Sequence, residues 1–183
     1  ESLSANNRNA LFFMSSHSGV IYDFENRTQT ILQGHCNVIT CCAIDSKKRW
    51  IVTADAGYDP IIVVWDAISC VPVKTFTAPH PYGVDAIDIS EDALYVSTLS
   101  ARDPSDASLS SSQELAIWAW TREENDPIVK QSIAATEHHH TVKFDPRSSN
   151  QIVTTGDKTI CFWNWNELSL ESYYGRASQK DLG

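Results

Sequence analysis

The stretch at residues 34–66 reads GHCNVITCCAIDSKKRWIVTADAGYDPIIVVWD and decides the fold. It holds three short apolar runs, at 38–44, 50–54 and 61–65, and the pieces between them are rich in Asp, Lys, Gly and Pro. A fourth apolar run follows at 71–76. Short runs of β-branched and aromatic residues bounded by such turn residues are typical of strands joined by hairpins. The stretch therefore predicts a unit of four antiparallel strands.

This unit recurs along the chain. The position of Trp65 is matched by Tyr22, Trp118 and Trp163, at intervals of 43, 53 and 45 residues. The intervals predict one sheet for each repeat, and the first repeat lacks a segment for its innermost strand. The expected division is a disordered or linker stretch at 1–9, a partial unit at 10–33, full units at 34–79, 80–136 and 137–174, and a polar tail at 175–183.

The longest interval results from an insertion at 101–112, between the second and third expected strands of its unit. The insertion is polar and rich in serine, which predicts a mobile loop rather than a strand. Loops on a rigid scaffold often carry binding residues, so this is a candidate partner-binding loop whose serines an acidic-directed kinase could also use. An unconstrained loop without function explains the same composition. The candidate residues are Asp103, Ser105, Asp106, Ser108, Ser110, Ser111 and Ser112.

Composition and charge disfavour several classes of protein. The 183 residues carry a formal net charge of −9, from 14 basic and 23 acidic side chains. Nucleic acid and anionic membrane surfaces both attract basic proteins, so neither is an expected partner. No apolar run is long enough for a membrane span, and no secretory signal opens the chain, although residue 1 is Glu rather than Met. The five cysteines, an odd number without paired spacing, predict free thiols in a reducing, cytoplasmic environment.

A Gly-His start and a Trp-Asp end around such strands resemble the WD40 repeat, whose blades run about 40–45 residues. The resemblance covers all but the polar ends of the chain. It implies an all-β WD40 β-propeller with about three full four-stranded blades plus one partial blade. Propellers typically close with about 4–8 blades, so we expect this chain to be part of a larger propeller. An open arc exposes apolar blade faces at both ends, and self-association of these open propeller edges would cover them.

WD-repeat blades often contain a structural hydrogen-bond network of a His, a Ser or Thr, an Asp in a tight turn and the Trp of the third strand. The resemblance implies the same network here, with the turn Asp lost to the insertion in the third unit. The expected members are His35, Thr53, Asp59 and Trp65 in the second unit, His80, Ser97 and Trp118 in the third, and His138, Thr154, Asp157 and Trp163 in the fourth.

Two catalytic alternatives use the same residues. His35, Thr53 and Asp59 could form a nucleophilic triad, but a similar set in the fourth unit favours packing over one unique site. The run at 138–140, three consecutive histidines, could hold Zn²⁺ and support a metal-dependent enzyme. No nucleophile elbow, P-loop, zinc-protease or EF-hand motif is present. We therefore expect no catalysis, no cofactor and no resident metal.

A closer resemblance is carried by two parts of the chain, His17-Ser18-Gly19-Val20-Ile21-Tyr22 with residues 32–37, and residues 48–55 with 62–66. These are similar to the early blades of the cilia- and flagella-associated WD-repeat proteins of the calmodulin- and spoke-associated complex. The resemblance implies a non-catalytic scaffold of the axoneme, at the radial spoke base, with a role in motility. It implies axonemal or spoke-associated protein partners, including a calmodulin-containing complex. A generic WD-repeat adaptor in ubiquitin ligation or trafficking is the alternative.

Overall fold

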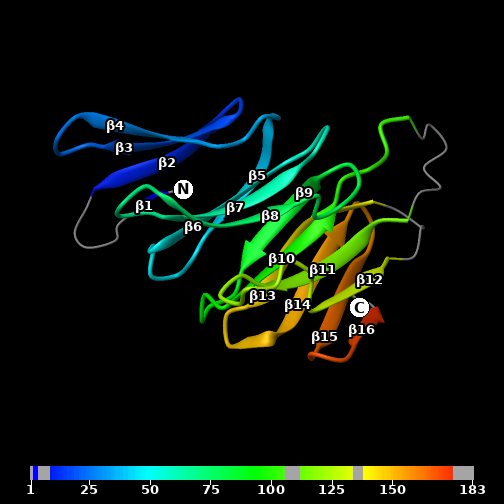
Figure 1. Ribbon diagram of the computed structural model, residues 1–183. Coiled ribbons are helices and arrows are strands. Elements are labelled where there is room, and N and C mark those ends of the chain that lie inside the picture. The colour runs from blue at the N-terminus through cyan, green and yellow to red at the C-terminus, as the bar shows by residue number, and fades with distance from the viewer. Residues whose placement is uncertain (1, 4–8, 106–111, 134–137, 175–183) are drawn as a thin grey trace, which may run out of the picture.

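Four antiparallel sheets of four strands each make up the fold (Figure 1). The computed structural model describes residues 2–3, 9–105, 112–133 and 138–174, and its regular structure there is entirely β. We number the sheets blades 1 to 4 in chain order. The strands are β1 (Ser2–Leu3), β2 (Ala10–Ser15), β3 (Ser18–Asp23) and β4 (Thr28–Gln33) in blade 1; β5 (Ile39–Ile44), β6 (Trp50–Asp55), β7 (Ile61–Asp66) and β8 (Pro72–Thr77) in blade 2; β9 (Val84–Ile89), β10 (Tyr95–Ser100), β11 (Glu114–Ala119) and β12 (Val129–Ser132) in blade 3; and β13 (His139–Asp145), β14 (Ser148–Gly156), β15 (Ile160–Trp165) and β16 (Leu170–Tyr174) in blade 4.

The described residues include no helix with the length and apolarity needed to cross a membrane. None of the five cysteines, all of which lie in the described ranges, forms a disulfide bond. The predicted fold class, an all-β WD40 β-propeller, is confirmed, with four full blades in place of the expected three full blades and one partial blade. The insertion connects β10 to β11 as expected.

Blade 1 departs from the expected division of the chain. Residues 1–9 were expected to be linker, but Ser2 pairs with Leu11 and Leu3 pairs with Ala10 to form the short edge strand β1. Blade 1 is therefore a four-stranded sheet rather than a three-stranded one. A strand of two residues is too short to show an alternating pattern, which is why the sequence did not predict it.

Side chains in two turns of blade 2 explain why the β5–β6 and β7–β8 hairpins fold back where they do. Asp45 Oδ1 accepts hydrogen bonds from the backbone N–H groups of Arg49 (2.7 Å) and Trp50 (2.6 Å). Asp66 Oδ1 accepts one from Ile68 N at 2.8 Å in the next turn. Asp side chains bond backbone groups a few residues on in this way, and so replace the ladder hydrogen bonds lost at a turn.

The blades pack face to face along the arc, and each tryptophan of a third strand lies on the face that meets the preceding blade. Trp118 joins Ile62 and Val64 of blade 2 in one buried cluster. Trp163 likewise joins Leu115 and Ile117 of blade 3 in another. Full burial of such aliphatic side chains contributes about 1.5–3 kcal/mol each, so these interfaces supply much of the stability.

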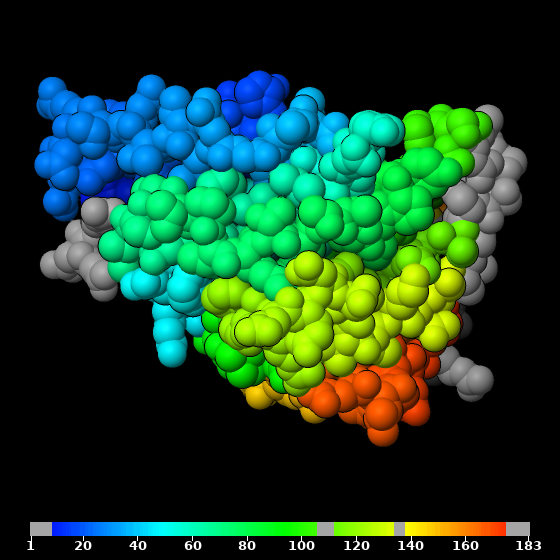
Figure 2. All heavy atoms as spheres, viewed as in Figure 1, coloured from blue at the N-terminus to red at the C-terminus, as the bar shows by residue number. Residues whose placement is uncertain are grey.

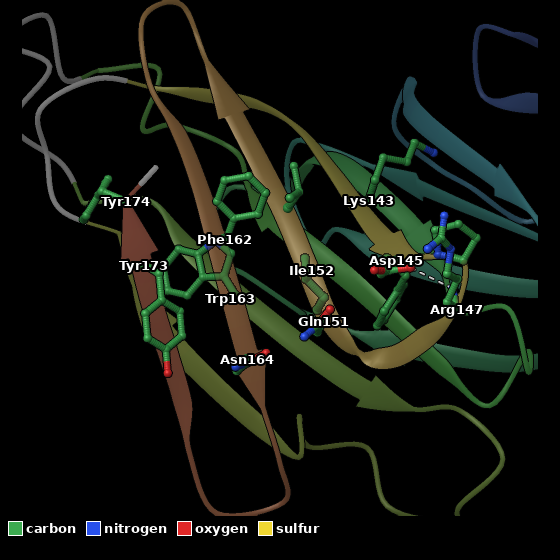
Figure 3. A pocket seen from close by; sticks show the side chains of 13 residues that line it. Lys143, Asp145, Arg147, Gln151, Ile152, Phe162, Trp163, Asn164, Tyr173 and Tyr174 are labelled. Atoms are coloured by element: carbon green, nitrogen blue, oxygen red, sulfur yellow. Dashed lines mark hydrogen bonds between the residues drawn. The ribbon is translucent and has the colours of Figure 1, made fainter. Parts of the chain in front are cut away.

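The two end faces of the arc are apolar but exposed. Ile160 and Phe162 of blade 4 are 52% and 46% exposed, whereas Leu115 and Ile117, at the matching positions of blade 3, are fully buried. Figure 3 shows Phe162 and Tyr173 side by side on this open face of blade 4. At the other end, Phe13 is 42% exposed.

Candidate functional site

Blade 2 holds a closed network of four buried side chains. His35 Nε2 lies 2.7 Å from Thr53 Oγ1, and Trp65 Nε1 donates to the same oxygen at 2.8 Å. On its other side, His35 Nδ1 lies 2.7 Å from Asp55 Oδ2. Because the indole can only donate, the Thr53 hydroxyl accepts a hydrogen bond from Trp65, and its own O–H can donate one to His35 Nε2. The side-chain polar atoms of His35, Thr53 and Trp65 in this network then all have partners.

The carboxylate of this network is Asp55, so the prediction of Asp59 is wrong. Asp59 is exposed in the β6–β7 turn with φ +48°, whereas Asp55 ends β6 and is fully buried. Its second oxygen accepts from Ile61 N at 2.8 Å, which ties the two ends of the hairpin together. Alternate residues of a strand share a face, so the Thr53-x-Asp55 spacing was the signal that could have identified it.

Blade 3 repeats the network only in part. His80 Nε2 and Trp118 Nε1 both lie 2.9 Å from Thr98 Oγ1. The prediction of Ser97 as the hydroxyl residue of the network is therefore wrong by one position. Neighbouring residues of a strand point to opposite faces of the sheet. Ser97 Oγ is buried, facing away from the network, with no hydrogen-bond partner among the described residues.

The carboxylate end of the blade 3 network is open. Ser100 stands at the place that Asp55 holds in blade 2, and its hydroxyl accepts from Glu114 N at 2.8 Å, as Asp55 does from Ile61 N. Ser100 makes no hydrogen bond to His80, whose Nδ1 instead lies 3.5 Å from Glu114 Oε2. Burial lowers the pKa of His80 to about 4, against the opposing effect of the Glu114 carboxylate.

In blade 4 the network histidine is His139, not the predicted His138. His139 Nδ1 lies 2.7 Å from Thr154 Oγ1, to which Trp163 Nε1 donates at 2.9 Å. The predicted Asp157 is also wrong, because its side chain is exposed and lies 3.1 Å from His140 instead. Successive side chains of a strand alternate between its two faces, and the sequence does not say which of the three adjacent histidines faces the core.

His138 joins blade 4 to blade 3. Its Nε2 lies 2.7 Å from Asp85 Oδ2, and burial lowers its pKa, opposed by the hydrogen bond to Asp85. Gln113 lies beside His138. Its side-chain amide donates to the carbonyl of His139 at 2.9 Å and accepts from the backbone N–H of His139 at 2.9 Å. Among the described residues no three His, Cys, Asp or Glu side chains converge as a metal site would require.

The described part of the insertion is folded against the connection that leads into β9. Tyr82 Oη donates to Asp103 Oδ2 at 2.8 Å, and Ser105 donates to Asp103 Oδ1 through both its backbone N–H and its hydroxyl. The loop base therefore lies on the same side of blade 3 as His80. Ser112 is exposed, and the candidate residues Asp106, Ser108, Ser110 and Ser111 lie outside the described residues.

The whole chain, residues 1–183, matches the family model described as the CFAP251 N-terminal domain. The chain belongs to this family. Its similarity to curated proteins points the same way: cilia- and flagella-associated protein 251 of Tetrahymena thermophila is 39% identical over 158 residues, which cover 85% of this chain and 16% of that protein. The Chlamydomonas reinhardtii protein of the same name is 30% identical over 165 residues, covering 84% of this chain and 20% of that protein.

A second group of proteins is similar at lower identity. Human echinoderm microtubule-associated protein-like 4 is 28% identical over 165 residues, covering 85% of this chain and 16% of that protein. The solved structure of U3-55K superposes with a TM-score of 0.66 at 19% sequence identity, covering 91% of this chain and 49% of that one. The CFAP251 N-terminal domain in this chain thus spans about a fifth or less of the curated relatives' length.

Proposed function

We propose that this protein is a non-catalytic protein-interaction scaffold of the ciliary or flagellar axoneme. The observation that carries the proposal is the match of the entire chain to the CFAP251 N-terminal domain, together with relatives from ciliates, algae and mammals that are named for cilia and flagella. We further propose a place at the radial spoke base and a role in the regulation of motility, on the strength of the sequence resemblance.

The geometry supports binding rather than chemistry. The His–Thr–Trp sets of blades 2, 3 and 4 are buried within single blades, and each repeats the role of the others. A buried network of this kind satisfies polar groups that would each cost about 1–3 kcal/mol if left unpaired. Rigid blades with loops at their ends are a suitable frame for docking several proteins.

Proposed partners are other axonemal or spoke-associated proteins, including a calmodulin-containing complex. The name of the echinoderm microtubule-associated relatives supports microtubule-bound assemblies as a setting for such a scaffold. The exposed apolar end faces, with Phe13 at one end and Phe162 at the other, support self-association of the propeller edges as a further way of assembly.

The proposal is tested by tagging the full-length protein in a ciliated cell that encodes it, and by deleting its gene. We expect the tagged protein along the axoneme after membrane extraction, and altered beating after deletion that the intact gene restores. A protein that stays in the cell body, or normal beating in the deletion strain, would contradict the proposal. Recovery with ubiquitin-ligase subunits instead of axonemal proteins would favour the adaptor alternative.

A further inference from the structure

Three loops meet at one end of blades 2 and 3 and line an open groove of about 810 Å³. We call it the tyrosine groove. It lies between the β6–β7 turn, the connection into β9 and the base of the insertion, where teal and green surfaces meet at the upper right of Figure 2. The residues that matter for its chemistry are Tyr58, Asp59, Tyr82, Asp85, Arg102 and Pro104.

Backbone hydrogen bonds hold the walls of the tyrosine groove in place. Gly57 N donates to Tyr82 O at 3.1 Å, and Ala101 N donates to Gly83 O at 2.8 Å. Gly83 has φ +104°, and a Cβ there would lie 2.3 Å from Ala56 Cα, so the two loops touch directly. Because these loops are already ordered, a ligand need not order them on binding, which removes one cost of association.

The groove presents aromatic side chains to solvent from this rigid frame. Tyr58 is 86% exposed, although its carbonyl is held by a 2.8 Å hydrogen bond from Asn37 Nδ2. Tyr82 is also exposed, and Arg102 lies beside it in the lining. Tyr and Arg are enriched among the residues that contribute most to protein–protein binding. An exposed tyrosine on a turn whose backbone is held in place, next to a hollow, therefore indicates a docking surface.

The charge of the tyrosine groove selects the kind of partner. Its lining contains two carboxylates, Asp59 and Asp85, and the adjoining Asp103 is a third, against the single guanidinium of Arg102. The local formal charge is thus negative, in keeping with the net charge of −9 for the chain. Ring faces and carboxylates together attract cations, and Arg102 remains available to donate to backbone carbonyls of an extended peptide.

We propose that the tyrosine groove docks an extended, lysine- or arginine-rich segment of a partner protein. A cationic side chain of that segment lies against the ring of Tyr58 and pairs with Asp59, and Tyr82 forms the opposite wall. This inference rests on the proposed binding role of the protein, but its test is made on the purified chain and does not depend on where the protein resides in the cell.

The test measures fluorescence anisotropy with three labelled, acetylated and amidated peptides of equal length, made of alternating Lys-Ser, Gln-Ser and Glu-Ser. We expect the Lys-Ser peptide alone to bind, more weakly as salt is added. Tyr58→Ala and Asp59→Asn should each weaken its binding roughly fivefold or more. Both side chains are exposed, and Asn tolerates the positive φ of position 59 well, so both variants should fold.

The matched controls are Asp126→Asn and Tyr174→Ala, which remove an exposed carboxylate and an exposed tyrosine outside the groove. Both should bind the Lys-Ser peptide as the unchanged protein does. Equal weakening by Asp126→Asn and Asp59→Asn would overturn the proposal, because it would show general attraction to an acidic chain. Equal binding of the Glu-Ser peptide, or an unchanged affinity in both groove variants, would overturn it as well.

Discussion

Blades 2 and 3 place a histidine, a threonine and a tryptophan in matching positions, yet the two histidines have different surroundings. His35 is held from both sides, by Thr53 and by the buried carboxylate of Asp55. His80 is held from one side by Thr98, and its Nδ1 has only the Glu114 carboxylate at 3.5 Å. The difference goes back to one position, which is Asp55 in blade 2 and Ser100 in blade 3.

The comparison separates two tasks of the network. The histidine–threonine–tryptophan part joins strands within a blade, and it survives in blades 2, 3 and 4. The aspartate part fixes the hairpin that follows β6, through the backbone N–H of Ile61. In blade 3 the corresponding connection carries the insertion at 101–112, so Ser100 keeps the bond to the next strand while the bond to the histidine is lost.

The largest expected effect is that of Asp55→Ala. The change leaves His35 Nδ1 and Ile61 N without their buried acceptor, and each buried donor left unpaired costs about 1–3 kcal/mol. We expect this loss in the free energy of unfolding, measured by urea denaturation. Asp59→Asn is the control and should change it by less than about 0.5 kcal/mol, because Asp59 is exposed and Asn tolerates the positive φ of this position. Equal effects of the two changes would restore Asp59 as the network residue.

The second-largest expected effect is a difference in stability between variants of the two network threonines, Thr53 and Thr98. Thr53→Val and Thr98→Val keep the side-chain shape but remove the hydroxyl that serves both the histidine and the tryptophan. Unpaired buried groups cost about 1–3 kcal/mol each. We expect Thr53→Val to cost more than Thr98→Val, because His80 is hydrogen-bonded from one side only, whereas His35 is also fixed by Asp55. Urea denaturation of both variants decides this, and equal losses would show that the aspartate does not restrain its histidine.

The smallest effect is a gain. Ser100→Asp, combined with Glu114→Gln to remove a competing charge, places a carboxylate where His80 Nδ1 can donate to it. Hydrogen bonds to charged groups contribute about 1.5–3 kcal/mol, so we expect a gain of roughly 1 kcal/mol or more over Glu114→Gln alone, seen as a higher thermal midpoint. A lower midpoint would mean that the loop after Ser100 does not allow the blade 2 geometry.

Much of the fold could be predicted because it depends on patterns of residues that are close together in the sequence. Four apolar runs separated by polar turns define each of blades 2, 3 and 4, and the spacing of Trp65, Trp118 and Trp163 sets the repeat. Turn side chains such as Asp45 act within five residues of their own position. Short-range chemistry of this kind does not depend on the rest of the molecule, so the sequence alone is sufficient to read it.

The wrong predictions concern positions where a shift of one residue along a strand changes which side chain faces the network. Ser97 and Thr98 are both hydroxyl residues, and only the pairing of β10 with β11 determines which one faces Trp118. The histidines at 138–140 present the same problem. The tyrosine groove could not be predicted from the sequence for another reason. Tyr58 and Arg102 are 44 residues apart and line the same groove only because two blades pack together.

The difference between the two blades is tested most directly by an NMR titration of the His80 imidazole. Burial is the main cause of its low pKa, so we predict a value of about 4, compared with 6.5 for an unperturbed histidine. Between these values the unfolded chain binds the proton and the folded one does not, so this group's contribution to stability is complete above pH 6.5 and falls as the pH drops toward 4. Ser100→Asp in the Glu114→Gln background should raise the pKa of His80. A value near or above 6.5 in the unchanged protein would contradict the account, because it would show that Glu114 already fills the place of the missing aspartate.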